Sequence, residues 1–402
     1  MALMTTTTAA AGIPRYYERR LLAMAEPIMV HYQLAQKGES VILPSGQGHT
    51  VYWTRYLPLT KRTTALTETT DGGITPVAIS DMQVSAQCYL YGHIAHIGRY
   101  IDLAHIDQNV AKRVDLLARN MGESVDYLVM DAIHGGDYAT NRIRIDNDAS
   151  YTFEATGDSG GSTTTIVDAS ISSNTGSTDD YWNNGYAICT DETSKSYGEV
   201  RLISDYTHSS GTVTVSTAFS ESMASKKFRI VASTGLAATT DNMSTAGVRF
   251  AVRELKRKKA LKFAGGTFSA ILPIDCEYDF MGDTTWVAAK EYSGVTDLYQ
   301  GEVGKWMGTR FITPSIEGDW REAAGTMGTY SATGAVYVVP FFGKDAVGVV
   351  NLKEQPQKVY VRTWEQLGQE IPLYSSVGWE ASLAAKVLNG NFVVGLMVSA
   401  TT

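Results

Sequence analysis

Cysteine is scarce in this chain of 402 residues. Its three cysteines, Cys88, Cys189 and Cys276, are odd in number and far apart in the sequence. This pattern encodes neither a disulfide framework nor a cysteine-based zinc site. We therefore expect a protein that matures in a reducing compartment.

Charged residues are also few. Asp, Glu, Lys and Arg make up 19% of the chain, against about 25% in an average soluble protein. The 34 basic and 42 acidic side chains leave a formal net charge of −8. This balance argues against a protein whose main task is to grip nucleic acid, because neutralising phosphates requires clustered Lys and Arg.

Long hydrophobic runs are missing as well. No uninterrupted apolar run approaches the roughly 18 residues of a membrane helix, and the Thr- and Ala-rich residues 1–12 lack the features of a secretory signal. We expect a protein that neither enters a membrane nor is exported. At roughly 150 residues per domain, the length predicts two or three structural units.

The strongest helical pattern covers residues 107–134. Apolar residues step by three or four along one face, and Gly135 and Gly136 end the pattern. Such a helix would span roughly 40 Å at about 1.5 Å per residue. Residues 15–36 also show helical spacing, interrupted by Pro27, which predicts a kinked amphipathic arm.

Two strand-like runs lie between the arm and this helix, over residues 50–57 and 77–90. The polar, glycine-containing residues 61–76 connect them. Connections this long are uncommon within a compact domain. We therefore predict a long ribbon whose connecting loop is functional or reaches toward a partner.

Composition changes over residues 147–240, where Ser, Thr, Gly, Asp and Asn dominate. Short strand candidates separated by turn residues predict a small all-β module; they cover residues 163–167, 185–189, 199–203, 212–216 and 228–231. Because helical and mixed patterns resume at Thr245, the module looks inserted into a host domain.

Three motifs hint at chemistry, and each has a plainer explanation. The string GDSGG at residues 157–161 matches the segment around the nucleophilic serine of trypsin-like proteases, yet the family's histidine segment is missing. The acidic start at Asp146 and Asp148 lacks the glycine and glutamate that an EF-hand loop requires. We interpret both as turns in a polar segment.

His93 and His96 form the third motif. In an extended segment, residues three apart point to opposite faces, and no third ligand accompanies them. No phosphate loop or dinucleotide fingerprint occurs. The sequence therefore predicts no catalytic residue, no metal site and no cofactor.

The arm, the ribbon, the long helix and the module resemble, in that order, the major capsid proteins of tailed bacteriophages with the HK97-type fold. The likeness is carried by RYYERRLLAMAEPIMVHYQLAQKGESVILPSGQGHTVYWTRYLPL, LTETTDGGITP and YGHIAHIGRYIDLAHID in residues 15–107. It resumes more weakly at ILPIDCEYDF, YQGEVGKWMGTRFITPS and GKDAVGVVNL in residues 271–352.

The resemblance implies an α+β, HK97-like capsid fold with an inserted small all-β domain. Its divisions would be an N-terminal arm (1–47), an extended β-hairpin loop (48–92), a peripheral domain with a long spine helix (93–146), the inserted domain (147–240), an axial domain (241–340) and a return to the peripheral and axial domains (341–402).

The resemblance also implies a structural role without catalysis. Copies would assemble into hexamers and pentamers that form an icosahedral head, enclosing double-stranded DNA without sequence-specific binding. The expected location is the virion capsid, after synthesis and assembly in the host cytoplasm. Scaffold, portal and decoration proteins are the expected partners.

The alternative function is a surface binding or decoration-type structural protein. It is motivated by Tyr181, Trp182 and Tyr186, which lie near one another in the inserted segment and would form a glycan-binding surface.

Two groups of residues are candidate contacts. Assembly contacts are expected in the arm and the extended loop, at Arg15, Tyr16, Tyr17, Arg19, Arg20, Lys61, Arg62 and Glu68. Some relatives crosslink a lysine of the extended loop to a neighbouring asparagine, but one lysine near a loop tip is too weak a signal to predict a crosslink.

The only dense basic run follows the inserted segment, on a helix expected over residues 246–262. Two interpretations are open: a solvated helical face, or an electrostatic contact with packaged DNA or an acidic neighbouring subunit. The candidate contact residues are Arg253, Lys256, Arg257, Lys258 and Lys259.

Overall fold

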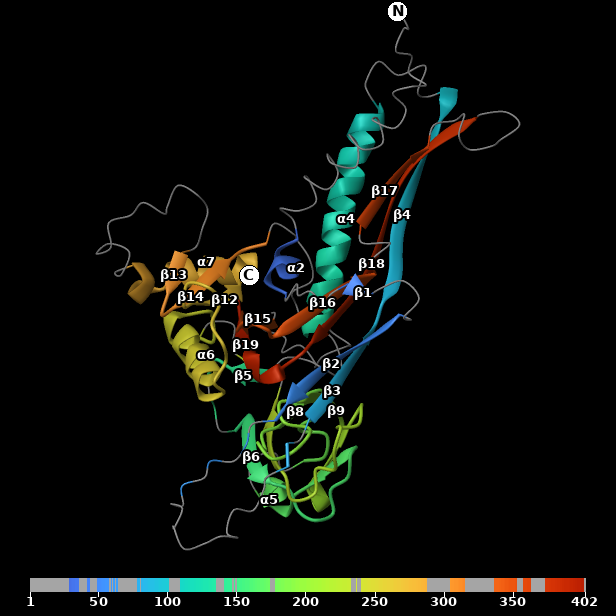
Figure 1. The fold of residues 1–402 in the computed structure, drawn as a ribbon. Coiled ribbons are helices and arrows are strands. Elements are labelled where there is room, and N and C mark those ends of the chain that lie inside the picture. The colour runs from blue at the N-terminus through green and yellow to red at the C-terminus, as the bar shows by residue number, and fades with distance from the viewer. Residues whose placement is uncertain are drawn as a thin grey trace, which may run out of the picture.

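Over the residues that the structure describes, the architecture is α+β, with three larger sheets and a separate two-stranded ribbon (Figure 1). The computed structural model describes residues 29–35, 42–43, 49–57, 59, 61, 63, 78–79, 81–100, 109–134, 141–146, 148, 150–173, 178–232, 236, 240–287, 304–314, 336–352, 357–362 and 373–400. Within these ranges, no helix is both long and apolar enough to span a membrane.

The first sheet carries the longest helix. Its strand order is β1 (Ile42–Leu43), β16 (Val347–Leu352), β18 (Tyr374–Val387) and β17 (Gln357–Arg362), and β4 (Tyr89–Gly98) also pairs with β18. Helix α4 (Asn109–His134) lies along one face of this sheet (Figure 1). The two elements share one hydrophobic core.

The sequence pattern explains why α4 forms and which side it buries. Its buried side chains recur every three or four residues, at Val114, Leu117, Met121, Val125 and Val129. They pack against apolar side chains of β18, including Trp379 and Leu383. The helix predicted over residues 107–134 is confirmed from Asn109 to His134, and residues 107 and 108 lie outside the described ranges.

The second sheet has the strand order β13 (Gly304–Trp306), β14 (Thr309–Ile312), β12 (Phe268–Ile271), β15 (Val336–Phe342), β19 (Val393–Ser399) and β5 (Asn141–Arg144). Helices α6 (Thr245–Arg257) and α7 (Ile274–Gly282) contribute to its core. Parallel pairing of β19 with β5 joins residues that are about 250 positions apart in the chain.

Helix α6 begins and ends on local signals. The Ser244 side chain caps its start by accepting a hydrogen bond from the backbone N–H of Gly247. The helix ends at Arg257, and Lys259 adopts a left-handed backbone with φ of 55°. The helix predicted over residues 246–262 is therefore too long at its C-terminal end, because the basic residues after Arg257 leave the helical conformation.

The third sheet has the strand order β6 (Thr152–Thr156), β11 (Lys227–Val231), β8 (Tyr186–Cys189), β9 (Val200–Thr207), β10 (Thr212–Val215) and β7 (Thr165–Val167). These strands, with helix α5 (Ala169–Ser173), enclose a hydrophobic core of their own. All five strand candidates in this segment form strands. Strand β6 was not predicted, because Phe153 is its one large apolar side chain.

The ribbon consists of β2 (Thr50–Tyr56) and β3 (Asp81–Gln87), which pair antiparallel from Thr50 with Gln87 to Tyr56 with Asp81. The single strand predicted over residues 77–90 is wrong. The strand is interrupted at Cys88, whose backbone N–H bonds to the carbonyl of His49. The chain then continues as β4 in the first sheet. Of the connection predicted over residues 61–76, only residues 61 and 63 are described.

The N-terminal arm predicted over residues 15–36 is described from Met29 onward. There the short helix α2 (Val30–Leu34) packs against α4. The buried His31 Nδ1 lies 2.7 Å from Asp126 Oδ2, and the backbone N–H of Tyr32 bonds to Asp126 Oδ1 at 3.1 Å. One buried carboxylate thus holds the arm to the long helix.

Candidate assembly surfaces

The first sheet packs one face against α4, and its other face carries exposed side chains among the described residues. Because side chains alternate along a strand, Tyr91 and Ala95 of β4 and Val359 of β17 pack into the α4 core. The intervening residues, among them Leu90, Ile94 and Tyr360, are exposed on the opposite face.

A groove of about 590 Å³ runs along this open face. Register places Gly378 of β18 between Ile94 and Tyr360, and Gly92 next to Glu380. A Cβ at Gly378 would lie only 3.0 Å from the carbonyl oxygen of His93, so a larger residue there would require the neighbouring strand to shift. The glycines form a low floor between apolar walls, while Arg362 and Glu380 add charge to the lining.

The ribbon is anchored on one face and exposed on the other. Val51 is buried with Cys88, Val350 and Ala384, whereas Tyr52 and Tyr56 point away and are 65% and 70% exposed. Large aromatic side chains left in water are a feature of surfaces that meet a partner.

Arg55 connects the ribbon to two other parts of the molecule. Its guanidinium donates to the carbonyl of Tyr197, at 2.6 Å, and to Asn389 Oδ1, at 3.1 Å. Burial lowers the pKa of Arg55, and nearby Glu199 partly offsets this effect. The ribbon is therefore fixed to both the third sheet and the turn between β18 and β19.

Comparisons with known proteins identify this arrangement. No protein-family model and no curated protein matches the sequence. Among solved structures, the capsid asymmetric unit of cyanophage Pam1 superimposes with a TM-score of 0.54 at 15% identity, covering 93% of each chain. The capsid of Ralstonia phage GP4 gives 0.50 at 11% identity, covering 92% of this chain and 90% of that chain.

The chain has a bacteriophage capsid fold. The resemblance that the sequence predicted is confirmed at the level of the fold. Because the two matches cover 92% and 93% of this chain, the likeness is not confined to one of its sheets.

The expected assembly residues of this capsid fold fall mostly outside the described ranges. Arg15, Tyr16, Tyr17, Arg19, Arg20, Arg62 and Glu68 are not described. Lys61 is described and its side chain is exposed. The open sheet face and the tyrosines of the ribbon were not predicted as contacts, although the alternation of residues 89–98 was a usable signal.

The basic run does not form one solvated face. Arg253, Lys256, Arg257 and Lys259 are exposed, but Lys258 is partly buried. Its Nζ donates to Asn391 Oδ1 at 3.2 Å and lies 5.6 Å from the centre of the Tyr197 ring. Burial, with a smaller contribution from Arg229, lowers the pKa of Lys258 to about 8. Lys258 is therefore a structural side chain as well as a cation.

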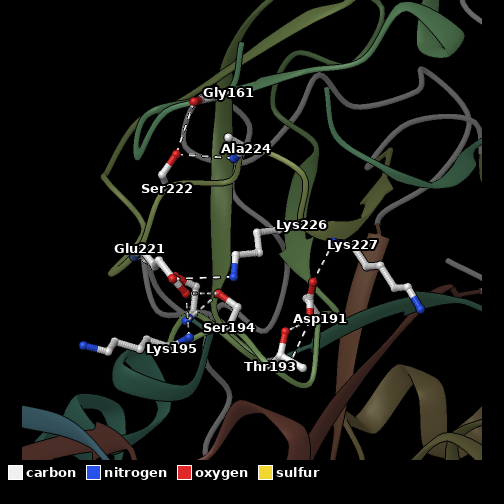
Figure 2. Close-up of polar contacts among 11 residues, drawn as sticks. Gly161, Asp191, Thr193, Ser194, Lys195, Glu221, Ser222, Ala224, Lys226 and Lys227 are labelled. Carbon is white, nitrogen blue, oxygen red and sulfur yellow. Dashed lines mark hydrogen bonds and ion pairs between the residues drawn. The ribbon is translucent and has the colours of Figure 1, made fainter. Parts of the chain in front are cut away.

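The protease-like string forms a hydrogen-bonded turn. Gly161 N–H bonds to the carbonyl of Asp158, and the Gly161 carbonyl accepts from Ser222 (Figure 2). Asp158 Oδ2 accepts from the backbone of Ala169 rather than orienting a histidine. Ser159 is exposed in this turn. These contacts agree with the turn interpretation of GDSGG.

The other motifs also have structural roles. Asp148 N–H bonds to Asp146 Oδ1, and Ser150 N–H bonds to Asp148 Oδ1, as in an Asx turn. His93 and His96 lie on strand β4, with the His96 ring against Tyr374 at 4.8 Å. Among the described residues, no three His, Cys, Asp or Glu side chains gather as a metal site would require.

Polar side chains of the third sheet fix its loops (Figure 2). Glu221 accepts from the Ser194 hydroxyl and the Lys195 N–H and pairs with Lys226 at 3.5 Å. Burial alone would raise the pKa of the Glu221 carboxyl, but these hydrogen bonds and Lys226 bring it below its usual value. The abundant Ser, Thr and Asp side chains of this segment thus form hydrogen bonds that fix its loops.

The aromatic group behind the glycan-binding alternative does not form a platform. Trp182 and Tyr186 are essentially inaccessible to solvent, and Tyr181 packs edge-on against Trp182. The three side chains lie close together, as the sequence implied, but two of them belong to cores of the fold. Trp182 and Tyr186 therefore offer no ring face for a sugar to stack on.

Proposed function

We propose that this chain is a structural major capsid protein of the HK97 type, which assembles into hexamers and pentamers around double-stranded DNA. The observation that carries the proposal is the capsid fold, shared with the cyanophage Pam1 capsid over 93% of both chains. The role is structural and non-catalytic.

Exposed apolar surfaces on separate elements support self-assembly. The groove beside Ile94 and the tyrosines of the ribbon lie on different parts of the molecule. A closed symmetric shell requires such distinct patches, because each copy must contact several neighbours at once. Many weak contacts then add up to a stable assembly.

The divisions implied by the resemblance form part of this proposal. Residues 48–92 would be the extended loop, 93–146 the peripheral domain with α4 as its spine helix, and 147–240 the inserted domain. Residues 1–47 would be the arm, 241–340 the axial domain, and 341–402 the return segment. The separate core of the third sheet supports the inserted domain.

The proposed setting is the virion capsid, after synthesis in the host cytoplasm with scaffold and portal proteins. A decoration protein is a further proposed partner. The formal net charge of −8 fits a DNA contact that is non-specific and weak.

Negative-stain electron microscopy of the purified chain tests the proposal. We expect rings of five or six subunits, or closed particles, at high protein concentration. Persistent monomers, both alone and with a co-expressed scaffold, would contradict it. A cryo-EM map of the particles would place the third sheet on the inside or the outside of the shell.

A further inference from the structure

Lys258 and Asn391 bring an amine and a carboxamide into contact. Lys258 follows the last residue of α6, and Asn391 lies in the short helix η7 (Gly390–Phe392) between β18 and β19. The two residues are 133 positions apart, yet Lys258 Nζ donates to Asn391 Oδ1 at 3.2 Å. The carboxamide carbon lies one bond beyond that oxygen. A nucleophilic nitrogen and an electrophilic carbon are therefore neighbours.

The Asn391 side chain is enclosed and fixed. The residue is 3% exposed, and its backbone N–H bonds to Asn389 Oδ1 at 3.1 Å. Gly198, in the connection between β8 and β9, packs against the carboxamide. A Cβ at Gly198 would lie 2.8 Å from Asn391 Cγ and 2.5 Å from Asn391 Nδ2. The absence of a side chain at Gly198 thus leaves the space that the carboxamide occupies.

The Lys258 amine is a nucleophile only in its neutral form. Burial lowers its pKa to about 8, so a large fraction is neutral at mildly alkaline pH. The titratable groups that act on it from the surrounding elements are, in order of effect, Arg229 of β11, Glu254 of α6, Cys189 of β8 and Glu154 of β6. Arg229 lowers the pKa, and the other three raise it.

A cavity of about 230 Å³ opens beside the pair. Both Lys258 and Asn391 line it. Its other titratable or charged lining residues are Arg55, Tyr56, Glu192, Tyr197, Arg257 and Lys259. The cavity has room for several water molecules, so a small leaving group has a route away from the pair.

We propose that the folded chain forms an isopeptide bond between Lys258 and Asn391. The neutral Nζ attacks Asn391 Cγ, a new N–C bond forms, and the bond from Cγ to Nδ2 breaks. The proton lost by Nζ passes to Nδ2, which leaves as ammonia. The reaction therefore needs no oxidant and no further reactant.

Proximity supplies most of the acceleration. Reacting groups held in contact gain an advantage equivalent to about 10⁵–10⁸ M over separate molecules. Among the described residues, no carboxylate is hydrogen-bonded to Lys258 Nζ or to the Asn391 carboxamide. Glu254, the carboxylate with the largest effect on Lys258, is itself bound by Arg257 at 3.1 Å. Without an acid to assist the leaving group, we expect a slow reaction.

The bond lies within one chain and joins α6 to the turn that precedes β19. It closes a large loop, which restricts the unfolded chain more than the folded one. Each copy is therefore stabilised by itself, whether or not it assembles. This inference goes beyond the proposed capsid function and does not depend on it.

Peptide mapping of the full-length chain by mass spectrometry tests the proposal. Freshly purified protein, in which the pair is hydrogen-bonded, is incubated at pH 9 and then digested. We expect a branched peptide that joins the segments around Lys258 and Asn391, lighter than their sum by one ammonia. Its amount should grow with time, and the unfolding temperature should rise with it.

The pH dependence of the rate separates this lysine from an ordinary one. For a pKa of about 8, the neutral fraction rises about tenfold between pH 7 and pH 9, whereas for an ordinary lysine it rises about a hundredfold. The rate should follow the smaller rise. A hundredfold rise would mean that the amine reacts only after leaving its buried site, which contradicts the proposal.

Two substitutions and one solvent condition serve as controls. Lys258→Met should form no branched peptide, because the amine is lost. Lys259→Met removes an exposed neighbouring amine and should react at the native rate. The native chain unfolded in urea at pH 9 should also form none, because its two groups are no longer held together. This last control requires no variant to fold.

Three results would overturn the proposal. The first is the absence of the branched peptide after prolonged incubation of the folded chain at pH 9. The second is its formation at the same rate in urea. The third is an equal loss of ammonia in Lys258→Met, which would assign that loss to cyclisation at Asn389 and Gly390. All three are measured on unassembled protein, so they are independent of the shell-assembly test.

Discussion

Lys258 illustrates how position changes the chemistry of a single side chain. It follows the last residue of α6, donates to Asn391 and is surrounded by protein on most sides. Its pKa of about 8 lies below the ordinary 10.5, because burial disfavours the ammonium form. The charge is therefore held at an energetic cost at neutral pH.

This cost predicts a pH dependence. Between about pH 8 and 10.5 the unfolded chain retains the Lys258 proton that the folded chain has released, so the free energy of unfolding rises with pH in that window. Relative to Lys258→Met, the native protein should gain up to about 3 kcal/mol between pH 7.5 and 10.5. Urea titrations at both pH values measure the difference.

Lys259→Met serves as the control, because Lys259 is an exposed neighbour. It should show the same pH dependence as the native chain. Identical pH profiles for Lys258→Met and the native protein would contradict the prediction.

The buried Asp126 is a second test at the residue scale. It accepts from both His31 and the backbone N–H of Tyr32, so Asp126→Ala removes both of these hydrogen bonds between the arm and α4. Removing one partner of a buried hydrogen bond costs about 1–3 kcal/mol of unfolding free energy. Denaturant unfolding monitored by tryptophan fluorescence measures the loss.

Asp131→Ala, an exposed change on the same helix, should alter the free energy of unfolding by less than about 0.5 kcal/mol. Equal effects of the two substitutions would show that the arm is not held by Asp126.

At the scale of elements, the side chains on the two faces of strand β4 have different surroundings. Tyr91 and Ala95 pack against α4, whereas Leu90 and Ile94 line the open groove. The same strand thus contributes to the core on one side and offers an apolar surface on the other. Substitutions on the two faces should have different consequences.

Ile94→Asp tests the open face. Since Ile94 is 57% exposed, the free energy of unfolding should change by less than about 1 kcal/mol. A charge in an interface that excludes water is costly, so assembly should require about tenfold more protein or fail. Sedimentation velocity over a concentration series measures this shift.

Leu261→Asp, at an exposed site between α6 and β12, is the matched control. Assembly that is unaffected by Ile94→Asp, or reduced equally by both changes, would rule out the groove as a specific contact surface.

At the scale of the whole molecule, Arg55 links parts that are far apart in sequence. It joins the ribbon to Tyr197, in the connection between β8 and β9 of the third sheet, and to Asn389 beyond β18. A two-stranded ribbon is marginally stable by itself. These bonds therefore help to hold it in a fixed direction relative to the rest of the fold.

Arg55→Ala should release the ribbon without unfolding the sheets. Hydrogen–deuterium exchange should become at least several-fold faster over residues 50–56 and 81–87, with little change in α4. Lys61→Ala, at an exposed position past the end of β2, should leave exchange unchanged. Unaltered exchange in Arg55→Ala would show that the Val51 contacts alone fix the ribbon.

Local patterns predicted much of the secondary structure. The repeat of apolar residues predicted α4, and short β-rich runs predicted five strands of the third sheet. The predictions failed where local signals were weak. Polar β6 was missed, and the break at Cys88 depends on a hydrogen bond to His49.

The order of helix and strand patterns, the acidic balance and the likeness to capsid proteins were all readable from the sequence, because periodicity and composition are properties of neighbouring residues. Tertiary structure alone decided which charges are buried, which aromatics remain exposed and where cations gather. Arg142, Arg229 and Glu254 meet in one cavity because three distant segments pack together. The spacing of these residues along the chain does not predict that they come together, because this depends on the packing of whole elements against one another.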